Sequence, residues 1–122
     1  MYGDMINLEI KERRIGEIVV LDMDGQMRIG GGSIVFRKTI RSLVEEGNNK
    51  ILLNLAGVSN IDSSGLGEIV SSHISLSKKG GQMKLLHLTQ SLRELMTITK
   101  LLTVFDVYED EAIAVASFKG AQ

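Results

Sequence analysis

The sequence contains no cysteine, and this absence excludes several kinds of site at once. A disulfide framework, a thiolate zinc site and a cysteine nucleophile all require that residue. The remaining metal ligands are carboxylates and two histidines. We predict no metal site and no cofactor.

A large excess of charge of either sign is also missing. The 14 Lys and Arg residues nearly cancel the 15 Asp and Glu residues. The densest basic clusters are residues 11–14 and the pair at 78 and 79. Nucleic-acid binding draws much of its affinity from neutralising phosphates, so we do not expect a nucleic-acid partner.

No apolar run reaches the length that spans a membrane. Residues 1–10 mix Asp4 and Glu9 with apolar residues, without the basic region and apolar stretch of a signal peptide. We therefore expect a cytoplasmic protein without a membrane partner. With 43% apolar and 24% charged residues, its 122 residues suit one globular domain covering residues 1–122.

Hydrophobic patterning in the first part of the chain predicts a hairpin followed by a helix. Residues 6–10 alternate between apolar and polar and predict a strand. Residues 13–17 read as a turn, and the apolar run at 18–23 as a second strand. Ser33 is expected to cap the first helix, which Gly47 ends.

The rest of the chain alternates between strands and helices. We expect strands at residues 51–55, 83–88 and 104–108, helices at 64–79 and 110–118, and a third helix after the cap Thr89. A hairpin followed by such units predicts an α/β domain. Its sheet is mixed, with parallel later strands, and is covered by about four helices.

The most distinctive local feature is the stretch IDSSGLG at residues 61–67, between a buried strand and a helix. Sites in open α/β sheets form at this edge. The unpaired N–H groups and positive dipole at a helix start would stabilise a phosphate on Ser63. A structural interpretation also stays open, in which the aspartate and serines cap the helix and the two glycines permit close packing.

Residues 51–67, ILLNLAGVSNIDSSGLG, resemble the signature of STAS domains, the anti-sigma-factor-antagonist fold. Residues 92–114, LRELMTITKLLTVFDVYEDEAIA, are similar to the third helix, last strand and last helix of the same family. The resemblance covers nearly the whole chain in one register, and DSSGLG is its specific part. It implies a binding protein without an active site of its own.

In regulatory members of this family, a partner kinase phosphorylates the serine that directly follows the aspartate. The resemblance therefore implies phosphorylation of Ser63, with Asp62 orienting it and Ser64, Gly65 and Gly67 supporting the site. It implies two partners, an anti-sigma factor/serine kinase with the histidine-kinase-like ATPase fold and a serine phosphatase. The unphosphorylated protein would bind the anti-sigma factor and release a sigma factor for transcription.

The partner surface is expected at the same edge, on the loop before Ser63, the exposed face of the second helix and residues 27–33. The residues assigned to it are Met27, Arg28, Ser33, Asn60, Ile61 and Leu66. Family members often carry an aspartate in a Gly-x-Leu-Asp pattern where this chain has Arg28. This reversed charge leaves the identity of the partner open. We expect a monomer or a weak dimer.

Two other functions stay open. Residues 19–25, VVLDMDG, resemble the nucleophile motif of haloacid-dehalogenase-type phosphatases. In that motif the first aspartate, here Asp22, attacks phosphate, and the second, Asp24, acts as acid/base beside magnesium. Gln26 replaces the usual threonine, which weighs against this function. The other alternative is a STAS module of a signalling scaffold or a lipid-transport complex without a phosphorylation cycle.

Other catalytic arrangements find little support in the sequence. Ser63 lacks a Gly-x-Ser-x-Gly elbow, and His73 lies about 15 Å further along the same predicted helix. His87, at a strand end, is interpreted as structural, because catalytic geometry has to be met first. The glycines at 30–32 are not followed by Gly-Lys-Ser/Thr, so they do not form a P-loop. We predict that the protein is not an enzyme.

Overall fold

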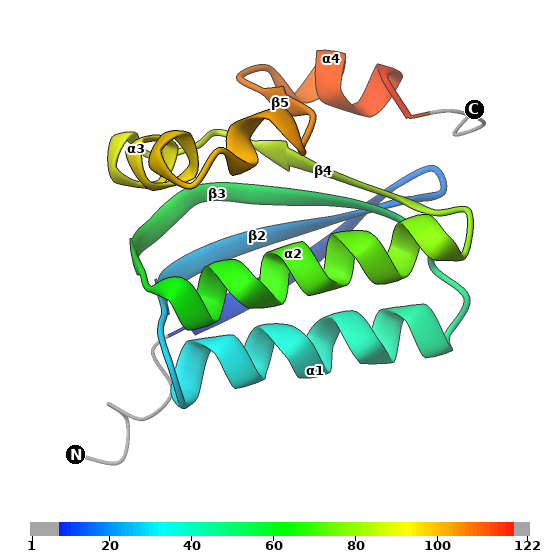
Figure 1. Ribbon diagram of the computed structural model, residues 1–122. Coiled ribbons are helices and arrows are strands. Elements are labelled where there is room, and N and C mark those ends of the chain that lie inside the picture. Colours follow the sequence, from blue (N-terminus) through cyan, green and yellow to red (C-terminus); the bar gives the residue numbers. More distant parts are fainter. Residues whose placement is uncertain (1–7, 119–122) are drawn as a thin grey trace.

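In the computed structural model, which describes residues 8–118, five strands form one mixed sheet in the order β1-β2-β3-β4-β5 (Figure 1). The elements are β1 (Leu8–Ile15), β2 (Ile18–Met27), α1 (Gly31–Glu45), β3 (Lys50–Ile61), α2 (Ser63–Lys78), β4 (Gln82–Leu86), α3 (Gln90–Ile98), the 3₁₀ helix η2 (Leu101–Thr103), β5 (Val107–Tyr108) and α4 (Glu111–Ala116). β1 is antiparallel to β2, and the later neighbours pair in parallel. The predicted hairpin followed by parallel strands is confirmed.

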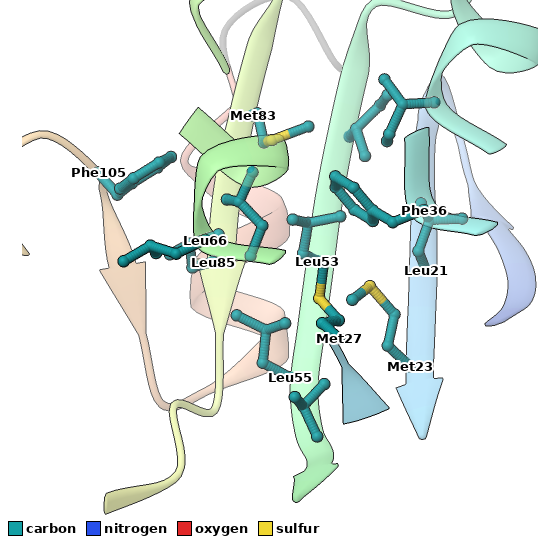
Figure 2. Close-up of a cluster of buried hydrophobic side chains, with 14 of the residues drawn as sticks. Leu21, Met23, Met27, Phe36, Leu53, Leu55, Leu66, Met83, Leu85 and Phe105 are labelled. Atoms are coloured by element: carbon teal, nitrogen blue, oxygen red, sulfur yellow. The ribbon is translucent and has the colours of Figure 1, made fainter. Parts of the chain in front are cut away.

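The sheet buries side chains on both faces because helices cover each side of its central strands. α1 and α2 run side by side along one face, and α4 lies on the other (Figure 1). On the first face, Phe36 and Leu66 from these two helices lie against Leu21 and Leu53 (Figure 2). The smaller core on the second face consists of Ile18, Val20, Leu52, Leu86, Ala114 and Phe118. Burial on two faces explains the continuous apolar runs of the parallel strands.

The hairpin between β1 and β2 is tighter than predicted. The two strands are joined by residues 16–17 alone, and Gly16 has φ +59°. Two-residue hairpin loops favour glycine at such positive φ angles. The predicted turn at residues 13–17 was too long, because its first three residues stay in the antiparallel ladder. Ile6, the predicted start of the first strand, lies outside the described residues.

β3 differs most from the prediction, because it continues to Ile61 where we expected a loop after residue 55. Its second half pairs with the end of β2, up to the partners Met27 and Ile61. Two register shifts let the strands stay paired. Close approach requires Gly57, where an added Cβ atom would lie 2.7 Å from the Met23 carbonyl oxygen. The predicted loop before Ser63 is therefore a strand.

The start of α1 also differs from the prediction. Its N-cap is Gly30, with φ +90°, and Ser33 lies inside the first turn as a buried residue. A Cβ atom on Gly32 would lie 1.9 Å from the Gln26 carbonyl oxygen. The glycines thus bring the helix start against β2 and leave no capping position for Ser33. At the other end, Gly47 follows the helix with φ +95°, as predicted.

Towards the C-terminus, the predicted cap of α3 is confirmed, whereas the last strand and the last helix are shorter than predicted. Thr89 caps α3 as predicted and accepts a hydrogen bond from the Leu92 N–H at 3.3 Å. The strand predicted at residues 104–108 shrinks to the two residues of β5, because Val104 is the C-cap of η2 and residues 105–106 are not in a strand. The last helix is shorter than predicted and is capped by Asp110, which accepts from the Ile113 N–H.

Candidate functional site

Asp62 is the residue around which the start of α2 is built. One carboxylate oxygen, Oδ1, accepts from the Gly65 N–H at 3.0 Å and caps the helix. The other, Oδ2, accepts from the Ile29 N–H at 2.9 Å. The backbone N–H of Asp62 donates to the Met27 carbonyl oxygen at 3.2 Å. One side chain and its own backbone thus join the start of α2 to the end of β2 and the turn that follows it.

The same donors hold the pKa of Asp62 below its ordinary value. The largest cause is the hydrogen bond from the Ile29 N–H, followed by that from Gly65. Desolvation opposes these two hydrogen bonds, and the backbone N–H of Ser64 and the positive charge of Arg28 lower the pKa further by smaller amounts. Hydrogen bonds to the charged form favour that form. Asp62 is therefore held in its charged form by the backbone groups that it positions.

Ser63 and Ser64 occupy different environments although they are adjacent. Ser63 is the first residue of α2 and its side chain is exposed. Ser64 is partly buried, and its hydroxyl donates to the Ser33 hydroxyl at 3.2 Å. This bond joins the first turns of α1 and α2, which begin at the same end of the sheet (Figure 1). Ser64 was expected to be a cap, but the cap is Asp62, and Ser64 instead connects the two helices.

The two glycines of the motif have unequal roles. A Cβ atom added to Gly65 would lie 2.2 Å from the Met27 carbonyl oxygen and 2.8 Å from the Met27 Cβ. Such contacts are too short for any side chain. A Cβ atom on Gly67 would meet nothing within 4 Å. Close packing therefore explains Gly65, whereas the expected packing role of Gly67 is not supported.

The six residues assigned to the partner surface divide by accessibility. Arg28 and Asn60 are exposed and Ile61 is partly buried, while the exposed fractions of Met27, Ser33 and Leu66 are 0%, 4% and 5%. Met27 and Leu66 belong to the main core (Figure 2). These three residues therefore lie beneath the exposed edge. Sequence proximity to the motif could not separate the two groups.

Sequence reasoning missed Ile29. It lies in the turn between β2 and α1, its backbone N–H bonds to Asp62, and its side chain is 79% exposed. A signal was present, since a large apolar residue directly before a glycine triplet is unusual in a turn, where small and polar residues dominate. The exposed edge therefore combines Ile29 with Arg28, Asn60 and Ser63.

The pair Asp22 and Asp24 lies on the face of the sheet that α4 covers in part. Asp22 accepts from Arg13 Nη2 at 2.9 Å and from Asn54 Nδ2 at 2.8 Å, and Arg13 also donates to Glu111 at 2.7 Å. The hydrogen bond from Arg13 is the main cause of the lowered pKa of Asp22 and of Glu111. Asp22 thus connects β1, β2, β3 and α4, which is a structural role.

The geometry gives a phosphatase site no support. Within residues 8–118, no three His, Asp or Glu side chains are arranged to hold a metal ion. His73 packs against Phe105, with ring centroids 4.7 Å apart. The backbone N–H of His87 donates to the Tyr108 carbonyl oxygen at 2.9 Å. Neither histidine shares a hydrogen bond with Ser63 in this part of the chain. No helix of the described region is long and apolar enough to span a membrane.

The family model of the STAS domain matches residues 9–114. The chain belongs to the STAS domain family. The anti-sigma-B factor antagonist of Bacillus subtilis (strain 168) is 31% identical over 107 residues, which cover 84% of this chain and 90% of that relative. The anti-sigma F factor antagonist of Paenibacillus polymyxa is 21% identical over 114 residues, covering 93% and 97%.

Solved STAS structures share the fold. A crystal structure from Thermotoga maritima has a TM-score of 0.84 at 25% identity and covers 90% of this chain and 94% of its own. The phosphorylated form of SpoIIAA from Bacillus has a TM-score of 0.68 at 20% identity, covering 87% and 96%. This chain is thus a STAS domain whose named relatives are anti-sigma factor antagonists. The motif predicted from the sequence, residues 61–67, coincides with the joint between β3, α2 and the turn after β2.

Proposed function

We propose that this STAS domain is a cytoplasmic anti-sigma factor antagonist that is switched by phosphorylation of Ser63. Without phosphate it binds an anti-sigma factor, and the sigma factor held by that partner is released for transcription. The anti-sigma factor is also the serine kinase, with the histidine-kinase-like ATPase fold, and a serine phosphatase resets the switch. The observation that carries the proposal is the exposed Ser63 at the start of α2, directly after a fixed Asp62.

Accessibility favours Ser63 over Ser64 as the modified residue. A kinase must reach the hydroxyl, and the side chain of Ser63 is exposed. The Ser64 hydroxyl is partly buried and bonded to Ser33. A related fold, SpoIIAA, has been solved in both phosphorylated and unphosphorylated forms. That pair supports a comparable modification in this chain.

Phosphate on Ser63 should leave the fold almost unchanged. It adds about −1.5 to −2 charges at pH 7. Asp62 repels this charge, whereas the N–H groups and dipole at the start of α2 attract it, and each effect is on the order of 1 kcal/mol. Arg28, close enough to lower the pKa of Asp62, adds attraction. The opposing local effects largely cancel.

A bound partner responds differently to the same phosphate. In a close-fitting interface the phosphate must lose water and occupy space that the partner already fills. An unpaired buried charge costs several kcal/mol. Loss of about 1.4 kcal/mol already weakens binding tenfold. The modification therefore acts on association rather than on stability.

The proposal is tested with the purified histidine-kinase-like anti-sigma factor encoded in the same genome. The chain, its Ser63→Ala variant and its Ser64→Ala variant are incubated with this kinase and ATP, and phosphopeptides are identified by mass spectrometry. We expect modification of the parent and of Ser64→Ala, and none of Ser63→Ala. Phosphate on Ser64 alone would overturn the site. Tight association with a scaffold or transporter subunit, without any phosphorylation, would favour the alternative STAS function.

A further inference from the structure

Ile29 is a large apolar residue that lies exposed at the edge that carries Ser63. It precedes the N-cap Gly30, and Ile34 lies in the first turn of α1. Residues at these two positions often pack together as a hydrophobic staple. A staple would shield both side chains, yet Ile29 is 79% exposed and Ile34 is 37% exposed. The turn therefore displays Ile29 to solvent.

The turn that carries Ile29 is held in place by its neighbours. Asp62 accepts from the Ile29 N–H at 2.9 Å, and the Ser33 N–H donates to the Arg28 carbonyl oxygen at 3.1 Å. The tight contact of Gly32 with the Gln26 carbonyl oxygen leaves the segment little room to shift. A side chain on such a preorganised turn loses little freedom when it binds. Rigid display of a large apolar group is typical of interface anchors.

The charged groups beside Ile29 indicate which kind of partner surface could bind there. Arg28 is exposed, and Asn60 on the paired strand is exposed and neutral. Asp62 is the nearby acidic group, but its two oxygens already accept backbone N–H groups from Ile29 and Gly65. The exposed groups of this edge are therefore the apolar Ile29 and the cationic Arg28, which lies beside the ionised Asp62 carboxylate and is the group that a partner carboxylate can pair with. A complementary surface is apolar at its centre and acidic at its border.

We propose that Ile29 is the apolar anchor of the partner interface, and that the anti-sigma factor presents an apolar pocket bordered by a carboxylate facing Arg28. This inference rests on the proposed function, since it describes the partner of the Ser63 site. The inference also explains why phosphorylation would weaken binding. Phosphate on Ser63 lies one residue from Asp62, whose carboxylate accepts the hydrogen bond from the Ile29 N–H. The phosphate's negative charge repels the acidic border of the pocket.

The test uses the purified, unphosphorylated chain and the purified anti-sigma factor from the same genome, with Kd measured by calorimetry. Ile98 on α3 is the matched control, since it is 78% exposed and lies on a different element. We expect Ile29→Ala to weaken binding tenfold or more and Ile98→Ala to change Kd less than twofold, with thermal midpoints of both within a few degrees of the parent. Equal effects of the two substitutions would overturn the anchor.

The charge of the partner is tested in the same assay. Arg28→Glu should weaken binding at least tenfold and Arg28→Lys no more than threefold, and the effect of Arg28→Glu should shrink at high salt, where exposed charges are screened. Tighter binding by Arg28→Glu would contradict the proposal that a partner carboxylate faces Arg28. If Ser63→Asp abolishes binding while Ile29→Ala is neutral, the inference fails and the proposed function stands. If the parent does not bind, both fail.

Discussion

Asp62, directly after β3, and Asp22, in the middle of β2, both have a lowered pKa but organise different kinds of surface. Asp62 is bonded to backbone N–H groups of two segments and leaves the serine beside it exposed. Asp22 is bonded to the side chains of Arg13 and Asn54, and through Arg13 to α4. The bonds of Asp62 fix the backbone of the turn after β2 and the start of α2, beside an exposed serine. The bonds of Asp22 join α4 to the sheet. A lowered pKa alone does not distinguish a candidate binding edge from a structural link.

The packing beneath the Ser63 edge gives the largest expected effect. Gly65→Ala should lower the free energy of unfolding by about 3 kcal/mol, because its Cβ would meet the Met27 backbone and overpacking is costly. Gly67→Ala is the control, with open space around it, and should be neutral or slightly stabilising by helix propensity. Urea denaturation of both variants measures the difference. Similar stabilities would show that α2 does not depend on close approach to β2.

Removal of each carboxylate sharpens the comparison between the two aspartates. Asp62→Ala should cost about 1 to 2 kcal/mol of stability through loss of the helix cap, and it should also weaken partner binding by releasing the Ile29 turn. Asp22→Ala should cost about 1 kcal/mol or less, since its pair with Arg13 is partly exposed to solvent, and should leave binding unchanged. Denaturation and calorimetry measure both quantities. Loss of binding in Asp22→Ala would contradict the separation of roles.

Acid and salt give a smaller effect with a defined sign. Because the pKa of Asp62 and of Asp22 is lowered on folding from the ordinary value of 3.8, each carboxylate stabilises the fold above that value. This stability is lost as the pH falls through the lower folded pKa. Asp62→Asn and Asp22→Asn should each flatten the fall of stability between about pH 5 and pH 2. A steeper fall in either variant would contradict the assigned pKa direction.

Salt should separate the two carboxylates further. At 1 M NaCl, where the screening length is about 3 Å, the partly exposed pair of Arg13 and Asp22 should contribute less than at low salt. The backbone hydrogen bonds of Asp62 should keep most of their contribution. Stability differences between parent and variant at low and high salt provide the measurement. If the stability lost on replacing Asp62 and the stability lost on replacing Asp22 depend equally on salt, the hydrogen bonds of Asp62 are screened as much as the pair of Arg13 and Asp22.

The order of strands and helices could be predicted because burial on two faces leaves unmistakable apolar runs, such as residues 18–21 and 51–53. The start of α2 was also predictable, since an aspartate followed by small residues is typical of a capped helix. The length of β3 was not, because Ala56, Gly57, Ser59 and Asn60 resemble turn residues. They remain in the strand because β2 continues beside them.

Accessibility at the site depended on tertiary packing and could not be predicted from the sequence. Leu66 belongs to the motif and Met27 pairs with Ile61 at its start, yet both are buried where α2 meets the end of β2. Ile29 is apolar and was overlooked, yet it is exposed because the turn after β2 points it away from the core. Which side chains are buried depends on which face of the sheet the last residues of a strand point to, and on the direction of the turn that follows.

Binding and stability measured together on the Ser63 phosphoprotein test the central claim most directly. The stoichiometrically phosphorylated chain is compared with the unmodified chain by calorimetry against the anti-sigma factor and by thermal denaturation. We predict a Kd at least tenfold weaker, which corresponds to about 1.4 kcal/mol, with a melting temperature within a few degrees of the unmodified protein. Equal affinity of the two forms, or a phosphoprotein that is unfolded, would contradict a switch that acts on the surface alone.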